Sequence, residues 1–176
     1  MFNPLRALMV AGVCLCLAFT GAAPAFADPQ RSPATGAPAF TYDRPDGWQI
    51  QLDGGATVTA PSKECFVMMH MVEDDGFAGQ STDQVAAVML DMIKAEPFSR
   101  SEPHPLGAAA ASAYYSRIVS EDGEMRLVLI LVRLNGSTVA AVLAATTPTA
   151  PAREREDYNR LIGSIRLQST EAPRSL

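Results

Sequence analysis

The sequence predicts an α+β fold, in which an antiparallel β-sheet is flanked by helices in a three-layer α/β/α sandwich. The strand patterns come in groups joined by tight turns, and only two helical patterns interrupt them, which argues against the regular alternation of a doubly wound parallel sheet. The segment from Leu127 to Val132 is apolar at every position, so a strand there is expected to be buried on both faces. Such a strand needs a helical layer on each side of the sheet.

The first strands are predicted between residues 40 and 60. Phe40–Tyr42 and Trp48–Leu52 alternate apolar with polar residues, as half-buried strands do. Asp53-Gly54-Gly55 is typical of a tight turn, and Ala56–Ala60 alternates again, so these segments indicate a hairpin. Trp48 stands at a strand start, where we expect its ring to be buried in the core.

A buried strand and a helix are predicted next. Cys65–Val72 is nearly continuously apolar and ends in the acidic run 73–75, which we expect to be a solvated turn. Ser81-Thr-Asp-Gln84 has the form of a capping box, and apolar residues then recur at helical spacing until Pro97, which should end the helix. The segment from Phe98 to Leu106 holds two prolines around His104 and is expected to be irregular.

The last part of the chain predicts a long hairpin and a second helix. Asn135-Gly136 joins the strand 125–134 to the strand 138–146, and this dipeptide is typical of a type I′ turn, in which both residues have positive φ. A further strand, 114–120, precedes them. Glu154–Gly163 predicts a helix that Gly163 closes, and residues 165–167 can add a short final strand.

The first 27 residues have the pattern of a cleaved secretory signal peptide. Arg6 precedes an apolar core, Leu8–Phe19, and Ala25-Phe26-Ala27 supplies the small residues that signal peptidase requires, so we expect cleavage near Ala27. The core is shorter than the ~20 residues that span a bilayer. Cys14 lies inside the core rather than after it, unlike the cysteine of a lipoprotein. The pattern predicts a periplasmic or secreted protein with no stable membrane anchor after cleavage.

The remaining chain reads as one domain. Residues 28–39 are rich in Pro, Ala, Ser and Thr and are expected to form a flexible lead, residues 40–167 the folded domain, and residues 168–176 a disordered tail. Cys65 is the one cysteine left after cleavage, so an intrachain disulfide is excluded. We expect Cys65 to be a buried apolar side chain, with an intermolecular bridge or a reactive thiol as alternatives.

Composition and motifs argue against several functions. The net charge is −5, the isoelectric point is near 5.0 and basic residues do not cluster, which argues against nucleic-acid binding. His70 and His104 are the only histidines, and no Gly-x-Ser-x-Gly or P-loop motif is present. Cys65 and His70, five positions apart on one strand, should point to opposite faces. The sequence therefore predicts no catalytic residues, no enzyme activity and no cofactor.

Metal binding is the one chemical alternative. Cys65-Phe-Val-Met68-Met69-His70-Met71 places soft donors together, and such donors select copper(I). Strand alternation separates them, because Met68 and His70 should face one side while Cys65, Met69 and Met71 face the other. The pattern equally fits a core strand in which methionines fill gaps. The acidic run 73–75 does not have the spacing of a calcium-binding EF-hand loop.

Two motifs carry a family resemblance. Phe40-Thr-Tyr-Asp-Arg-Pro-Asp-Gly-Trp48 resembles the start of PsbP-like and DcrB-like domains, and the long hairpin, acidic helix and Ile162-Gly-Ser-Ile-Arg166 are similar to their end. The resemblance covers nearly all of residues 40–167 and implies an α/β/α sandwich around an antiparallel sheet. It implies no single activity, because members include photosystem subunits of the thylakoid lumen, bacterial envelope proteins and secretion-effector chaperones.

The sequence as a whole predicts a non-enzymatic exported protein that acts as a binding or assembly factor. Its partner is expected to be an envelope protein or a small apolar ligand. The alternative function is copper binding by the soft donors of the strand 65–71. These donors are Met68, Met69, His70, Met71 and also Cys65, and the ligands on one face are Met68 and His70.

Overall fold

The computed structural model of the chain describes residues 29–33, 38–120 and 123–168. The predicted signal peptide (1–27) lies outside these residues, as does the predicted tail (168–176) except for Gln168, which ends a strand. Among the described residues, no helix has both the length and the apolar character needed to cross a membrane.

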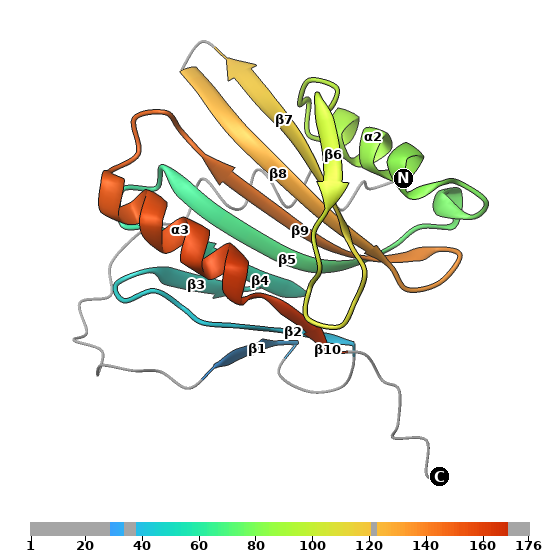
Figure 1. The fold of residues 1–176 in the computed structure, drawn as a ribbon, viewed down its shortest axis with the longest axis horizontal. Coiled ribbons are helices and arrows are strands. Elements are labelled where there is room, and N and C mark those ends of the chain that lie inside the picture. Colours follow the sequence, from blue (N-terminus) through green and yellow to red (C-terminus); the bar gives the residue numbers. More distant parts are fainter. Residues whose placement is uncertain (1–28, 34–37, 121–122, 169–176) are drawn as a thin grey trace, which may run out of the picture.

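A seven-stranded sheet forms the body of the fold, and each neighbouring pair of its strands is antiparallel (Figure 1). In spatial order its strands are β3 (Gln49–Leu52), β4 (Gly55–Thr59), β5 (Cys65–Glu73), β9 (Thr138–Thr146), β8 (Gly123–Arg133), β7 (Ser112–Ser120) and β6 (Arg100–Pro103). A smaller sheet contains β1 (Gln30–Ser32), β2 (Ala39–Tyr42) and β10 (Arg166–Gln168).

Two helices cover the large sheet from opposite sides. Helix α2 (Thr82–Met92) packs on β7 and β8, whereas α3 (Ala152–Ser164) packs on β5 and on β2 of the small sheet. Figure 1 shows α3 lying across the near face of the sheet, on the β5 side. The α+β class and the sandwich arrangement predicted from the sequence are therefore confirmed.

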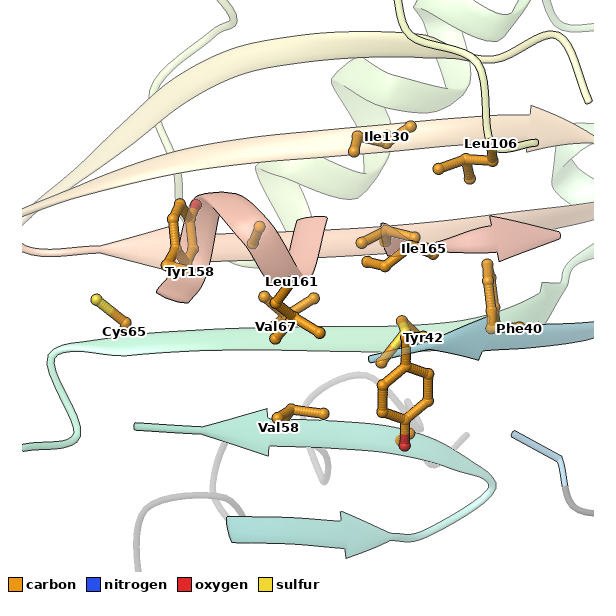
Figure 2. Packing of buried hydrophobic residues seen from close by; sticks show 14 of the residues in the cluster. Phe40, Tyr42, Val58, Cys65, Val67, Leu106, Ile130, Tyr158, Leu161 and Ile165 are labelled. Carbon is orange, nitrogen blue, oxygen red and sulfur yellow. The ribbon is translucent and has the colours of Figure 1, made fainter. Parts of the chain in front are cut away.

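Strand β8 is buried on both faces, as its continuous apolar pattern predicts. Leu127, Leu129 and Leu131 belong to the core under α2, whereas Ile130 and Val132 belong to the core under α3. Figure 2 shows the α3 side, where Leu161 of the helix lies over Val67 of β5. Each face of this strand therefore contributes to a separate hydrophobic core.

Local signals predicted the start of α2 correctly. Ser81 Oγ accepts a hydrogen bond from the Gln84 backbone N–H (3.2 Å), and Gln84 Oε1 accepts one from the Ser81 N–H (2.8 Å), which completes the capping box. The helix ends at Met92, well before Pro97, and Lys94 takes a positive φ of 61° just after it. Trp48 is buried, also as predicted.

Pairing between distant segments corrects two predictions. The segment expected to be irregular contains β6, an edge strand that tolerates Pro103 at its end because a strand edge needs no partner for every N–H. The segment 28–39, expected to be a flexible lead, contains β1, which pairs with β2. Residues 28 and 34–37 of that lead lie outside the described part.

One turn prediction and one helix-end prediction are also wrong. Neither Asn135 nor Gly136 has a positive φ, so the loop between β8 and β9 is not a type I′ turn. Instead, Asn135 Oδ1 accepts hydrogen bonds from the backbone N–H groups of Ser137 (3.0 Å) and Thr138 (2.8 Å). Gly163 lies inside α3, which continues through Ser164, so this glycine does not close the helix.

Candidate functional site

A groove of about 380 Å³ opens on the α3 side of the large sheet, beside β6, β7 and β8. We call it the α3–β7 groove. Its charged lining residues are Arg100, Arg117, Arg126, Glu96 and Glu124, and its apolar and aromatic lining includes Pro97, Tyr115, Val128 and Tyr158. The groove exists because α3 packs over β5 and leaves this part of the sheet uncovered.

Because side chains alternate along each strand, the groove residues of β7 and β8 point to the same side of the sheet. Arg126 and Val128 lie two positions apart on β8, between residues that face α2, and they pair with Arg117 and Tyr115 on β7. Thr146 of β9 is the partner of Arg126 on its other side. The row Arg117–Arg126–Thr146 therefore crosses three strands at one end of the groove.

Each arginine of this row has one carboxylate partner at the surface. Arg117 Nε lies 2.7 Å from Glu96 Oε2, and this hydrogen bond raises the pKa of Arg117. Arg126 Nε lies 3.6 Å from Glu124 Oε1. The two arginine side chains are 52% and 68% exposed, so these pairs are screened by solvent and stabilise the fold only slightly.

Tyr115 forms the side of the groove next to β6. Its hydroxyl donates a hydrogen bond to Glu102 Oε1, and this bond, together with burial, raises the pKa of Tyr115. The guanidinium carbon of Arg100 lies 3.9 Å from the centre of the same ring, which is a cation–π contact. Arg100 and Tyr115 thus present a stacked cationic and aromatic surface to the groove.

The floor of the groove is apolar and continuous with the core. Val128 packs against the α3-side core, and Tyr158 of α3 is itself 6% exposed. Burial raises the pKa of Tyr158, so its phenol stays protonated in neutral solution. Figure 2 shows Tyr158 at the same end of this core as Cys65.

Cys65 pairs with Thr146, which lines the groove, and is fully buried, as predicted. Its Sγ lies 3.2 Å from Thr146 Oγ1. Burial raises the pKa of the Cys65 thiol, and the contact with Thr146 opposes this only in part. A buried protonated thiol is a poor nucleophile, because the thiolate is the reactive form.

The donors of β5 separate onto two faces, as strand alternation predicts. Cys65 and Met69 are buried in the α3-side core, whereas Met68 and His70 are half-buried on the opposite face. The structure therefore brings Met68 and His70 to one surface and does not bring Cys65 to them. The described residues contain no group of three or more His, Cys, Asp or Glu side chains that could hold a metal ion.

The environment of His70 is unusual in one respect. Its Nε2 is buried and has no hydrogen-bond partner among the described residues. The ring lies against Gly55 of β4, where an added Cβ would be 2.4 Å from His70 Nδ1. Burial lowers the pKa of His70, and the charge of Asp53 opposes this.

The acidic run after β5 forms a local turn. Asp74 Oδ1 accepts a hydrogen bond from the Gly76 N–H (2.8 Å) and caps the short 3₁₀-helix η1 (Asp75–Phe77). Residues 73–75 are exposed, in agreement with the solvated turn expected from the sequence.

His104 lies in the loop after β6, where its backbone N–H donates a hydrogen bond to the Ala111 carbonyl.

The groove residues are not among those predicted from the sequence. Arg117 and Tyr115 alternate along one strand, and Arg126 and Val128 alternate along the next, which is the signal that could have placed them on one face. Their register follows from the hairpin that joins the two strands. Glu96 could not be assigned in this way, because it comes from the segment after α2.

The fold and the groove define a class: a small α/β/α sandwich with an open groove that has both apolar and charged lining residues. No protein-family model matches the sequence, and no curated protein is similar to it. Solved structures do match, and the chain has a PsbP-like fold, as the sequence motifs predicted.

Three solved structures illustrate the likeness. Cyanobacterial PsbP (CyanoP) from Synechocystis sp. PCC 6803 is 12% identical, with a TM-score of 0.54 over 84% of this chain and 98% of that one. LpqN, involved in cell envelope biogenesis of Mycobacterium tuberculosis, is 10% identical, with a TM-score of 0.51 over 80% of this chain and 90% of that one. A protein from Bacteroides thetaiotaomicron is 12% identical, with a TM-score of 0.46 over 76% of this chain; the match spans 46% of that longer protein.

Proposed function

We propose that this chain is exported to the periplasm and acts there as a non-enzymatic binding or assembly-factor protein, which holds a segment of a partner protein in the α3–β7 groove. The observation that carries the proposal is the groove itself, in which an apolar floor is surrounded by charged side chains. Protein–protein interfaces have this anatomy, with an apolar centre and a polar rim.

A protein segment fits the groove better than a small apolar ligand does. Small-molecule sites are concave and enclose most of the ligand in apolar side chains. The α3–β7 groove is open, and ion pairs such as Arg117–Glu96 line its rim. An extended segment can contact the apolar floor and the charged rim together, whereas a small apolar molecule would leave the rim unused.

The envelope location is supported by two observations. The N-terminal pattern with small residues before Asp28 is typical of an exported protein. LpqN, which has the same fold, is involved in cell envelope biogenesis. A role in envelope assembly for this chain is in line with both, and the unreactive environment of Cys65 favours binding over catalysis.

Site-specific photo-crosslinking in living cells tests the proposal. A photoreactive phenylalanine analogue replaces Pro97, which is exposed and lines the groove, or Gln51 as a control, which is exposed on the edge strand β3. We expect a discrete crosslinked species from position 97 and none of that size from position 51. No adduct from position 97, or the same adducts from both positions, would contradict a partner in the groove.

A second candidate function is copper(I) binding through Met68 and His70. The observation that favours it is the buried Nε2 of His70, which has no hydrogen-bond partner among the described residues and lies on the same face as Met68. Imidazole and thioether groups are both ligands of copper(I).

A further inference from the structure

Arg117 and Arg126 are directly opposite each other on neighbouring strands. Their Cα atoms are register partners of β7 and β8, and both side chains line the α3–β7 groove. Like charges directly opposite each other in a sheet are unfavourable unless a counter-charge is near. The sheet therefore places two arginines side by side along one part of the groove, where a single anionic segment can contact both.

The carboxylates of the chain itself only partly meet this need. Glu96 contacts Arg117 at 2.7 Å, while Glu124 lies 3.6 Å from Arg126, and both pairs are largely exposed. Exposed pairs of this kind are weak and exchange readily with other partners. Both arginines can therefore accept a stronger anionic partner without the loss of a buried ion pair.

The groove is less negative than the protein as a whole. Three arginines and two glutamates line the groove, whereas the chain has a net charge of −5. The third arginine, Arg100, is stacked over Tyr115 at the groove surface, and its guanidinium group lies 4.0 Å from Glu102 in an exposed, weak ion pair. Guanidinium groups bind carboxylates through paired, charge-assisted hydrogen bonds.

The occupant also needs an apolar part. Val128 and Tyr158 form the floor beside the arginine row, and Pro97 adds to the apolar lining. A free carboxylate or a phosphate ion would leave this surface unused. A peptide that carries acidic and aromatic side chains in alternation matches both the arginines and the floor.

We propose that the α3–β7 groove recognises an acidic, aromatic-containing segment of its partner protein, with carboxylates held between Arg117 and Arg126 and an aromatic side chain on Val128 and Tyr158. This inference rests on the proposed function and specifies the chemistry of the partner at the same groove. The charge complementarity of the arginine row selects the acidic segment.

Fluorescence anisotropy with two peptide probes tests the inference. One probe alternates aspartate with phenylalanine, and the matched probe has asparagine in place of every aspartate. The groove variant is Arg117→Gln/Arg126→Gln, and the control variant Arg153→Gln/Arg160→Gln makes the same charge change on the exposed outer face of α3. Urea unfolding of all three proteins verifies that each variant is folded.

We expect the aspartate probe to bind the wild type and the control variant about tenfold more tightly than the asparagine probe, which is the effect of one charge-assisted hydrogen bond. The groove variant should lose this preference, and salt should weaken only the aspartate complex. Equal affinity for both probes, no binding of the aspartate probe, or an equal loss in the control variant would overturn the inference.

Sedimentation with vesicles that contain phosphatidylglycerol separates a protein segment from a lipid surface. Vesicle binding that depends on Arg117 and Arg126, without binding of the aspartate probe, would overturn the acidic segment as the occupant. The crosslinking from position 97 reports on occupancy whatever the charge of the partner. A position-97 adduct that persists in the Arg117→Gln/Arg126→Gln variant would overturn the inference and leave the proposed function standing.

Discussion

The hydroxyl of Tyr114 donates a hydrogen bond to Asp83 Oδ1 at 2.7 Å and so joins β7 to the first turn of α2. The Tyr114 ring is fully buried and contacts Phe98 edge to face, with ring centres 5.1 Å apart. Burial is the main cause that raises the pKa of Tyr114 to about 12, and the hydrogen bond to Asp83 adds to it. This one contact fixes the start of α2 against the sheet on the face opposite the groove.

Tyr114→Phe should destabilise the protein by about 1–2 kcal/mol, because it removes a hydrogen bond to a charged group and keeps the buried ring. Urea unfolding followed by circular dichroism measures the free energy of unfolding. Tyr115→Phe is the matched control: its hydroxyl bonds Glu102 at the exposed surface, and its loss should be smaller. Equal effects of the two variants would contradict the structural role of the Tyr114–Asp83 bond.

Gly55→Ala should destabilise the fold by about 2 kcal/mol, the cost of overpacking a closely packed site. The added Cβ would lie 2.4 Å from both His70 Nδ1 and the Met69 carbonyl oxygen, and the backbone oxygen has no room to move within the sheet. Gly136→Ala is the control, because nothing lies within 4 Å of its Cβ position and its φ is not positive. A Gly55→Ala variant as stable as Gly136→Ala would refute the close packing of β4 on His70.

The stability of the protein should fall as the pH falls below 6.5, and His70 should account for part of this loss. The pKa of His70 is lowered in the folded state, so the unfolded chain takes up a proton at a higher pH than the folded protein does. Acid therefore favours unfolding. Well above pH 6.5 His70 is neutral in both states, and the effect vanishes. Unfolding free energies at several pH values between 7.5 and 5 measure the slope. His70→Gln should flatten it, and His104→Gln serves as the comparison; an unchanged slope in His70→Gln would contradict the prediction.

Copper(I) competition against a chromogenic chelator tests the second candidate function. The protein should withdraw copper(I) from the chelator, and Met68→Leu/His70→Phe should abolish this, because both proposed ligands are lost. Met69→Leu/Met71→Leu is the matched control, since it removes two thioethers on the other face of β5. Copper uptake that is absent from the wild type, or unchanged in Met68→Leu/His70→Phe, would rule this candidate out.

The features that the sequence predicted correctly are those that neighbouring residues determine. The capping box of Ser81 and Gln84 is complete within four positions, and the apolar run in β8 requires burial on both faces wherever the strand is placed. The separation of Met68 and His70 from Cys65 likewise follows from strand alternation alone.

The features that the sequence could not predict depend on partners far along the chain. Strand β6 forms despite its proline because β7 offers it an edge, and β1 forms because β2 does. The α3–β7 groove depends on where α3 stops covering the sheet, which no local pattern encodes. Its arginine pair is set by the β7–β8 register, and the Glu96 partner comes from a separate segment.

At Gly163 the local sequence pattern and the structure disagree about where α3 ends. The sequence pattern favours a glycine that closes α3 with a positive φ, but in the structure Gly163 is helical and has open space at its Cβ position. Gly163→Ala should therefore stabilise the protein by about 0.5–1 kcal/mol, the difference between alanine and glycine inside a helix. A glycine with positive φ would instead make the alanine variant less stable by about 1 kcal/mol, because the added Cβ would clash. The sign of the change in urea midpoint decides between the two, and a lower midpoint would contradict the extension of α3 through Ser164.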